Sequence, residues 1–383
     1  MTDIIAIDRR GSDSNKWRAF PQNVIPLPVA DMDYAADPAI IAAIEKRLAH
    51  GVLGYGSATD SLRAVLVDAM MHDYGWKIEP DWLVFLPGVE PGFNMALNAF
   101  TRPGDTVMQE FPVYKPLRTA PATWGLKTAA IWQTHSETGR WESDHEALEK
   151  AASHASLMLL CNPQNPTGRV YSHEELTFRA SLCLKHDLLL VSDEIHCGLT
   201  LDGRKHIPVA SLSKDIENRS ITLMAASKTW NIAGLKAAFA IVPNAAIRSR
   251  FMEAKKGLVD SVNVLGLAAM EAAYRDGGAW RQAVREKIAE NRDMLHRALD
   301  ETMPKAKALK ADASFLAWID LSAYNLNAPA ASWLLQHARI GVSDGRDFGD
   351  GLEQFVRLNF ASAAETLAEA LRRMAKALEN KER

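Results

Sequence analysis

The chain has 383 residues, of which 48% are hydrophobic and 24% are charged. This is ordinary globular composition, and the length predicts a large core divided between two domains. The formal net charge of −3 gives no reason to expect nucleic acid or an anionic membrane as a partner. No apolar run approaches the ~20 residues that a membrane-spanning helix needs.

The cysteines and the N-terminus both favour a cytoplasmic protein. Cys161, Cys183 and Cys197 lie apart in apolar segments, without a CxxC pair or a cluster of metal-binding residues. We therefore expect reduced, buried thiols and no metal site. The first residues lack a secretory pattern, because their basic residues follow the apolar ones.

A predicted first helix is followed, through the middle of the chain, by alternating predicted strands and helices. The first helix is expected at residues 38–50, with Asp37 as its cap, Pro38 in its first position and Gly51 at its end. Apolar runs that are typical of strands then alternate with amphipathic stretches such as the helix predicted at 174–186. The predicted strands are residues 82–86, 106–109, 156–161, 188–192, 221–225 and 237–242. Strands that are apolar on both faces predict an α/β fold with a mostly parallel sheet covered by helices.

The pattern changes from about residue 280 onward. A long charged helix is followed by a predicted strand at 313–321 and a final helix. That last helix carries one apolar stripe at helical spacing. The stripe consists of Leu367, Leu371, Met374 and Leu378. We expect a large α/β domain at residues 50–284 and a smaller α+β domain formed by residues 1–49 together with 285–383.

A lysine stands where a reactive amine could be placed. Lys228 follows a predicted buried strand and lies between Ser227 and Thr229. A lysine in a partly dry pocket has its charged form disfavoured, so its pKa falls and its amine becomes a usable nucleophile. Lysines that form Schiff bases need that situation. The tripeptide alone also fits an ordinary surface lysine at the end of a strand.

Polar side chains also follow two other predicted strands. Asp193 ends an apolar run, at the edge where open α/β sheets bind ligands, and a buried aspartate there needs a cation such as a protonated pyridine nitrogen. The turn 162–168 contains two Asn-Pro pairs, which make it rigid and able to present the amide of Asn165 to a ligand. Alone, Asp193 also fits a helix cap, and His196 also fits a core histidine.

Together these motifs resemble a known family. Their order along the chain matches fold-type I enzymes that use pyridoxal 5′-phosphate (PLP), the class I/II aminotransferase group. The motifs are residues 162–168, 192–196, 227–229 and 357–360. The resemblance covers nearly the whole chain and implies the PLP-dependent transferase-like fold of the aspartate aminotransferase type.

The resemblance implies a role for each of five side chains. Lys228 would bind the cofactor as a Schiff base, and Asp193 would pair with its ring nitrogen. Asn165 would donate a hydrogen bond to the ring oxygen O3′, and Tyr114 would stack on the ring. Lys228, Asp193 and Tyr114 would thus be the catalytic groups. Arg357 would bind the α-carboxylate of an amino-acid substrate in a bidentate pair.

A second set of residues is expected around the cofactor phosphate. Gly88, Val89 and Glu90 stand at the start of a predicted helix, and helix N-termini suit anions. Ser227 and Lys236 are also expected to bind the cofactor. Many aminotransferases have an arginine at the position of Lys236, eight residues after the Schiff-base lysine.

Finer features are similar to the MalY/PatB-type cystathionine β-lyases. They are residues 8–17, 29–34, 50–55 and 343–349, and His196, where many aminotransferases have tyrosine. The resemblance implies that His196 lies at the cofactor and that Asp31 binds the substrate. It also implies that Tyr55 reaches the cofactor phosphate of a partner subunit, and therefore that the protein is a homodimer.

We therefore expect a carbon–sulfur β-lyase that converts cysteine S-conjugates into pyruvate, ammonia and a thiol. The alternative is an aminotransferase that uses the same site to pass amino groups between amino acids and 2-oxo acids. A PLP-binding regulator without turnover is a third class. It is disfavoured because such regulators carry an added DNA-binding domain, whereas here the motifs begin within the first 20 residues.

Overall fold

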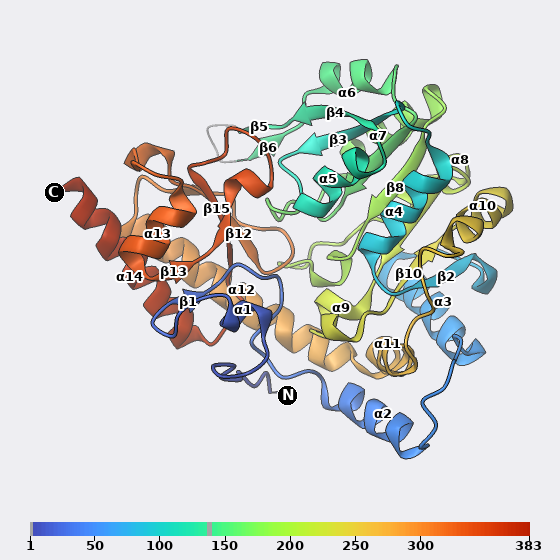
Figure 1. Ribbon diagram of the computed structural model, residues 1–383, viewed down its shortest axis with the longest axis horizontal. Helices are drawn as coiled ribbons and strands as arrows, with labels where there is room; N and C mark the ends of the chain where they lie inside the picture. The colour runs from blue at the N-terminus through green and yellow to red at the C-terminus, as the bar shows by residue number, and fades with distance from the viewer. Residues whose placement is uncertain (1–2, 136–139) are drawn as a thin grey trace.

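The computed structural model describes residues 3–135 and 140–383, and its centre is a seven-stranded sheet in the order β2-β10-β9-β8-β7-β3-β4 (Figure 1). All neighbouring strands from β9 to β4 are parallel, and β10 is antiparallel to both of its neighbours. The strands are β2 Leu83–Leu86, β3 Thr106–Phe111, β4 Lys127–Trp132, β7 Leu157–Cys161, β8 Leu189–Asp193, β9 Ser220–Met224 and β10 Ala238–Ile241. The expected α/β fold with a mostly parallel sheet is confirmed.

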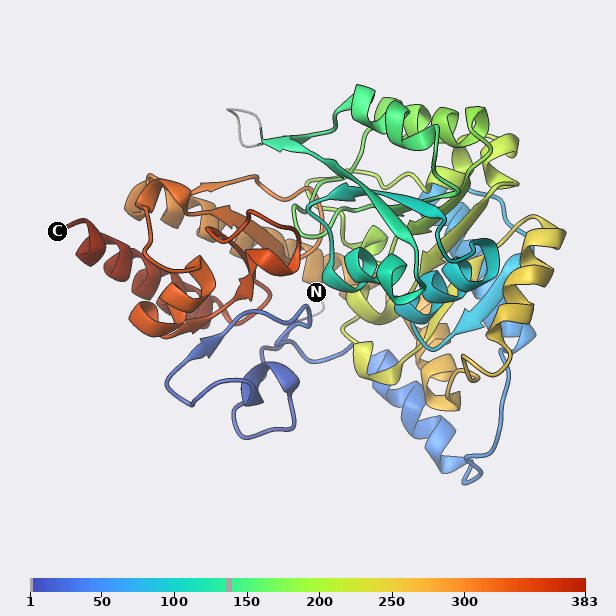
Figure 2. The same ribbon diagram turned by 45° about the horizontal axis from the view of Figure 1, so that its top comes forward.

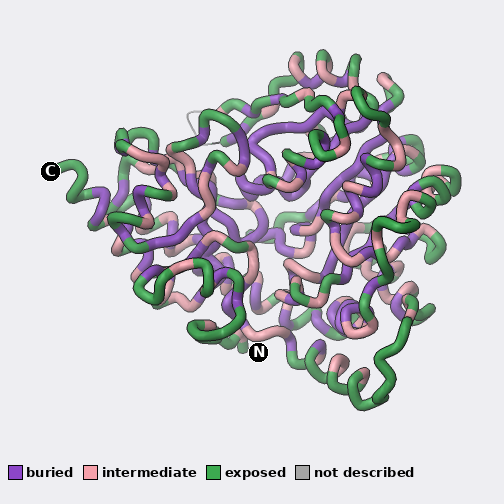
Figure 3. Tube along the Cα trace, in the orientation of Figure 1, coloured by how far each residue is buried: buried purple, intermediate pink, exposed green. Residues whose placement is uncertain are grey.

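Both faces of this sheet are buried because successive side chains of a strand point to opposite sides. In β7, Leu157 and Leu159 pack in one apolar cluster, whereas Met158 and Leu160 pack in another. The first cluster includes residues of α4 (Val89–Phe100), α5 (Lys115–Thr123) and α10 (Ala245–Lys255). The second includes residues of α6 (His145–Ala152), α7 (His173–Lys185) and α8 (Lys214–Glu217). Figure 3 shows the resulting buried centre.

The predicted elements are present, with end points that differ by at most three residues. Helix α2 (Pro38–Ala49) begins as expected, because the Asp37 side chain accepts a hydrogen bond from the backbone N–H of Ala39. Strand β4 was not predicted. It is the outer strand of the sheet, and only Ile131 among its residues is buried, so its sequence lacks the apolar run that marked the other strands.

A smaller antiparallel sheet lies beside the large one, in the order β11-β12-β15-β14. Its strands are β11 Lys307–Ala308, β12 Leu316–Asp320, β14 Ser343–Asp344 and β15 Phe355–Asn359. It is accompanied by α12 (Gly278–Thr302), α13 (Ala330–Ala338) and α14 (Ala364–Glu382). The predicted apolar stripe of α14 is buried.

The N-terminal segment runs along the smaller sheet before it crosses to the larger part, as Figure 2 shows. Its strand β1 (Ile25–Pro26) pairs with β13 (Ile340–Gly341). The remaining elements are α1 Asn15–Arg18, α3 Asp60–Tyr74, α9 Ala226–Thr229, α11 Val264–Asp276, β5 Thr134–His135 and β6 Trp141–Glu142. In the described residues, no helix combines the length and apolar character needed to cross a bilayer.

The division into domains 50–284 and 1–49 with 285–383 stays a proposal. Helix α2 packs against α11, which lies inside the segment assigned to the large domain (Figure 1). We therefore propose that α2 belongs to the large domain and that the boundary falls before Pro38.

Candidate active site

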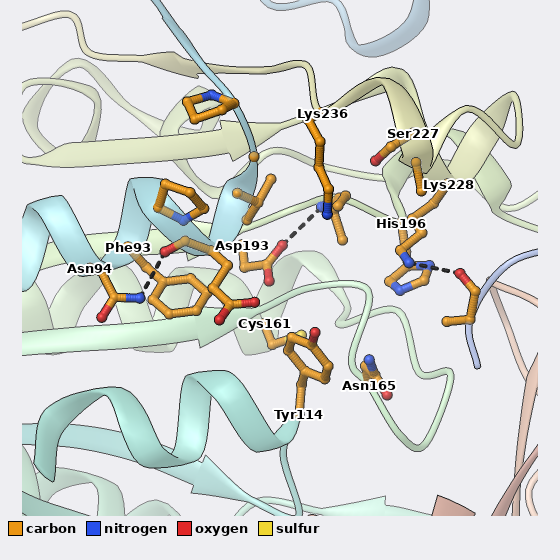
Figure 4. A pocket seen from close by; sticks show the side chains of 18 of the residues that line it. Phe93, Asn94, Tyr114, Cys161, Asn165, Asp193, His196, Ser227, Lys228 and Lys236 are labelled. Carbon is orange, nitrogen blue, oxygen red and sulfur yellow. Dashed lines mark hydrogen bonds between the residues drawn. The ribbon is translucent and has the colours of Figure 1, made fainter. Parts of the chain in front are cut away.

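A cavity of about 960 Å³ opens at the carboxyl ends of the parallel strands, between the two sheets. Its lining comes from the loops after β2, β7, β8 and β9, the start of α4 and α5, the N-terminal segment and the smaller sheet. This is the edge at which open α/β sheets bind ligands. In Figure 4 the labelled side chains of Tyr114, Asp193, His196, Lys228 and Lys236 surround a common space.

Lys228 lines this cavity and brings a primary amine into it. It lies on α9, the short helix that directly follows β9, and its Nζ donates a 2.7 Å hydrogen bond to the backbone carbonyl of Ala30. Burial, followed by the positive charge of Arg357, lowers the pKa of Lys228 to about 8. A substantial fraction of this amine is therefore neutral, and nucleophilic, in mildly alkaline solution.

Asp193 is the last residue of β8 and is almost fully buried. Its Oδ1 accepts a 3.1 Å hydrogen bond from the backbone N–H of Ile195. Burial raises the pKa of this carboxyl to about 7. Within the described part of the chain, no cationic side chain forms an ion pair with it. A bound cation at this position would keep the carboxylate ionised.

His196 lies behind the same space and is neutral. Burial, followed by the charges of Lys228 and Arg357, lowers the pKa of its imidazole to about 3. The ring packs edge-on against Phe315 with a centroid distance of 6.2 Å. Its Nδ1 is buried and has no hydrogen-bond partner in the described structure, so this nitrogen is available to a ligand.

Arg357 reaches the cavity from β15 of the smaller sheet. Its Nη1 donates a 2.9 Å hydrogen bond to Oδ1 of Asn165, and its Nη2 donates to the carbonyl of Pro28 and to Oγ of Ser343, at 2.9 and 3.2 Å. The guanidinium lies 4.9 Å from the ring centroid of Phe348. Burial lowers its pKa to about 10, so it remains a cation at neutral pH.

No carboxylate pairs with Arg357 in residues 3–135 and 140–383, although the side chain is almost fully buried. A buried guanidinium without an anion is costly, because its neutral acceptors compensate only part of the lost hydration. An incoming carboxylate would supply the missing charge and can accept two parallel hydrogen bonds.

The start of α4 lines the cavity and has the features of an anion-binding helix terminus. Gly88 is the N-cap of this helix and has no side chain to occupy the free N–H groups of the first turn, which includes Val89 and Glu90. Helix N-termini bind phosphates through such groups. Ser227 and Lys236 line the same cavity, so they add a hydroxyl and a positive charge.

Tyr114 is the N-cap residue of α5 and lines the cavity with its ring. Burial, followed by the charges of Glu90 and Asp193, raises the pKa of its phenol to about 12. The phenol is therefore neutral at physiological pH. A partly buried, neutral aromatic ring suits stacking against another ring.

Two of the expected site residues lie outside the cavity lining. The side chain of Tyr55 is fully exposed, away from the cavity of its own chain. Asp31 is not among the residues that line the cavity, and Arg9 and Lys16 bind its carboxylate at 3.0 and 3.2 Å. The structure thus places Asp31 beside the site, with its charge already compensated.

Sequence reasoning missed the contacts that come from backbone atoms and from the smaller sheet. The Ala30 carbonyl carries no side-chain signal, although it lies inside the motif 29–34. The Pro28 carbonyl, which accepts a hydrogen bond from Arg357, likewise carries no side-chain signal. Ser343 begins the motif 343–349, but its hydroxyl could not be assigned to Arg357 without the strand pairing of β14 with β15.

A cavity at the ligand-binding edge of a parallel sheet, lined by a lysine, an aspartate and an arginine, is the arrangement expected from the resemblance. The family model for aminotransferase class I and II matches residues 22–374. The chain therefore belongs to the class I and II aminotransferase family, and the predicted family and fold are confirmed.

Within this family, the chain is similar to several individual proteins. The chain is 38% identical to the cystathionine beta-lyase PatB of Bacillus subtilis over 383 residues, which is 97% of this chain and 98% of PatB. Its structure is similar to that of cystalysin from Treponema denticola, which contains pyridoxal 5′-phosphate, with a TM-score of 0.94 and 31% identity over 98% of both chains. It is also similar to OvoB, with a TM-score of 0.93 and 43% identity over 97% of both chains.

Replacing Arg357 by lysine tests its assignment to a carboxylate. Lysine keeps the charge but cannot make the bidentate pair. Losing a hydrogen bond to a charged group costs about 1.5–3 kcal/mol. We therefore expect kcat/KM for an amino-acid substrate to fall by about 10- to 150-fold, as that cost converts at 1.36 kcal/mol per tenfold.

Arg63→Lys is the matched control, because the Arg63 guanidinium donates to the carbonyls of Pro80 and Leu83, outside the cavity lining. Steady-state kinetics of both variants decide the question. An Arg357→Lys enzyme with unchanged kcat/KM would show that another group binds the carboxylate.

Proposed function

We propose that this protein is a PLP-dependent carbon–sulfur β-lyase that acts on cysteine S-conjugates. The observation that carries the proposal is the meeting of Lys228, Asp193 and Arg357 in one cavity, whose lining also includes the uncapped start of α4. The similarity to PatB, a cystathionine beta-lyase, favours this reaction among those of the family. Water and the conjugate would give a thiol, pyruvate and ammonium, with atoms and charge in balance.

The cavity suits PLP at each of its functional groups. Lys228 would bind the aldehyde, and Asp193 would face the ring nitrogen. The uncapped start of α4, with Ser227 and Lys236, would hold the phosphate. Tyr114 would stack on the ring, whereas Asn165 and His196 would contact its polar edge. The buried carboxyl of Asp193 and the buried Nδ1 of His196 both need polar partners, which supports this fit.

When bound, PLP supplies an electron-withdrawing ring that acidifies the Cα–H bond of an attached amino acid. Asp193 would face the ring nitrogen and, as a carboxylate, would favour its protonated form, which maintains that withdrawal. Arg357 holds the α-carboxylate and fixes the orientation of the substrate. The free amine of Lys228 then takes the proton from Cα, a task suited to a base whose pKa is about 8. The thiolate leaves from Cβ and takes up a proton.

An aminotransferase is the second candidate, and the match to the aminotransferase class I and II model is the observation in its favour. Lys228, Asp193 and Arg357 would have the same roles. The difference lies in the amino group. A β-lyase releases it as ammonia in each cycle, whereas a transaminase stores it on the cofactor until a 2-oxo acid removes it.

The need for an oxo acid separates the two reactions. We expect the enzyme, given cystathionine or another cysteine S-conjugate without an oxo acid, to form many equivalents of pyruvate per site. Homocysteine or another thiol should appear in the same amount. The measurement is a coupled pyruvate assay together with a thiol assay over time.

The control adds a 2-oxo acid to the same mixture, which should not be required for turnover. If no thiol forms from any conjugate, while amino groups pass to the added oxo acid, the lyase proposal is wrong and the aminotransferase stands.

We also propose that the enzyme is a cytoplasmic homodimer with shared active sites. Tyr55 lies in an irregular segment in which Val52 and Leu53 are also largely exposed. Exposed apolar residues clustered on one segment mark a protein–protein contact surface. From such a surface Tyr55 would reach the cofactor phosphate of the second subunit. Buried free thiols at Cys161, Cys183 and Cys197 favour a reducing compartment.

Tyr55→Phe should weaken the retention of PLP, because its hydroxyl would lose a hydrogen bond to a charged phosphate. Such a bond is worth about 1.5–3 kcal/mol, so the dissociation constant should rise about 10- to 150-fold. Equilibrium dialysis of PLP measures this. Tyr324→Phe is the control, since Tyr324 is buried beside Lys305 and does not line the cavity. A fully active monomer in analytical ultracentrifugation would contradict the shared site.

A further inference from the structure

The segment 28–32 crosses the cavity wall as irregular backbone, and each of its carbonyls accepts a hydrogen bond from a side chain. We call this segment the strap. Buried carbonyls outside a sheet need such donors. The donors are Arg357 and Ser343 to Pro28 (both 2.9 Å), Asn359 to Val29 (2.7 Å), Lys228 to Ala30 (2.7 Å), Asn359 and Lys16 to Asp31 (2.6 and 3.1 Å), and Asn231 and Arg9 to Met32 (3.1 and 3.3 Å).

These donors fix the orientation of the Ala30 carbonyl. Asn359 Nδ2 binds the carbonyls on both sides of it, those of Val29 and Asp31. Asn231 binds both backbone groups of Met32. Its Oδ1 accepts a hydrogen bond from the Met32 N–H at 2.9 Å, and its Nδ2 donates one to the Met32 carbonyl. The acceptor of Lys228 therefore sits on a rigid support.

Four charged side chains form a cluster of ion pairs at the end of the strap that contains Asp31. Lys16 is completely buried, and its Nζ lies 3.2 Å from Oδ1 of Asp31 and 2.8 Å from Oδ1 of Asp33. Nη1 of Arg9 lies 3.0 and 3.2 Å from the same two carboxylates. The indole Nε1 of Trp17 donates to Asp33 at 3.1 Å. This cluster joins the motifs 8–17 and 29–34, of which only Val29 and Ala30 line the cavity.

We propose that the strap and its charge cluster form a positioning element for Lys228. The Ala30 carbonyl accepts a hydrogen bond from the free amine of Lys228 and so orients it. The electrostatic effect of Asp31 on this amine is set by Lys16 and Arg9, which compensate the Asp31 carboxylate. A neutral amine that donates one proton to this carbonyl keeps its lone pair free for the proton of Cα. The role of Lys228 as that base rests on the proposed function, whereas the effect of the cluster on the amine does not.

The sign of each charge effect follows from the groups that face Lys228. Arg357 and Lys236 lower the pKa of its amine, whereas Asp31 and Asp193 raise it, and His196 is neutral. Removing the charge of Asp31 should therefore lower the pKa of Lys228. Removing the charge of Lys16 leaves Asp31 less compensated, so the pKa of Lys228 should rise. If the cluster only stabilised the fold, both substitutions would change the pKa of Lys228 in the same direction.

The experiment measures the amine of Lys228 directly, in full-length protein from which the cofactor has been removed. Acetylation of the Lys228 peptide near neutral pH is followed by mass spectrometry in Asp31→Asn, Lys16→Met and the double variant. Below the pKa, a pKa change of about 0.5 alters the neutral fraction about threefold. We expect about threefold faster labelling in Asp31→Asn, about threefold slower labelling in Lys16→Met, and a rate close to that of the unmodified sequence in the double variant.

Asp31→Asn is isosteric at a partly exposed side chain, so it decides the sign alone if Lys16→Met does not fold. Lys305→Met, which removes an exposed lysine paired with Glu382, is the control and should leave labelling unchanged. Equal rates in Asp31→Asn and the unmodified protein, or changes of the same sign in both single variants, would overturn the proposal. A protein that shows the expected signs but does not bind PLP would refute the proposed function and leave the strap assignment standing.

Discussion

A buried charge needs a partner of opposite charge. The site depends on two buried charged groups, Arg357 and Asp193, that form no ion pair within the described residues. Arg357 is buried among neutral acceptors, and Asp193 is buried with one backbone N–H as its donor. Each would destabilise the fold less if a ligand supplied the opposite charge. An amino acid joined to a pyridine cofactor supplies both, because it carries a carboxylate at one end and a ring cation at the other.

The same burial that leaves these charges unpaired also adjusts their pKa values. It raises the pKa of Asp193 to about 7 and lowers that of Lys228 to about 8, so the two pKa values become similar. One physical cause thus gives a base that is partly neutral near physiological pH and a carboxyl that depends on its ligand for its charge. The site is built from both sheets, since the Arg357–Asn165 hydrogen bond connects β15 with the turn after β7. Movement of one sheet relative to the other would therefore change the site.

The elements that could be predicted from the sequence are those whose burial requires a recognisable apolar pattern in their own residues. Strands such as β7 and β8 are buried on both faces and so carry continuous apolar runs, whereas the exposed edge strand β4 does not. The motif order led to Lys228, Asp193, Asn165 and Arg357, which the structure brings to one cavity. Contacts made by the backbone of Ala30, and the compensation of Asp31 by Arg9 and Lys16, depend on tertiary pairing and leave no local pattern.

The central claim is that the amine of Lys228 binds the cofactor aldehyde, and borohydride reduction followed by peptide mapping tests it most directly. Purified protein should be yellow, and reduction should attach the pyridoxyl group to the peptide that contains Lys228. The variant Lys228→Ala should show no reduced adduct, even if the proposed phosphate site at the start of α4 retains some PLP. A pyridoxyl group found on Lys236 or on any other lysine of the unmodified protein would contradict the account.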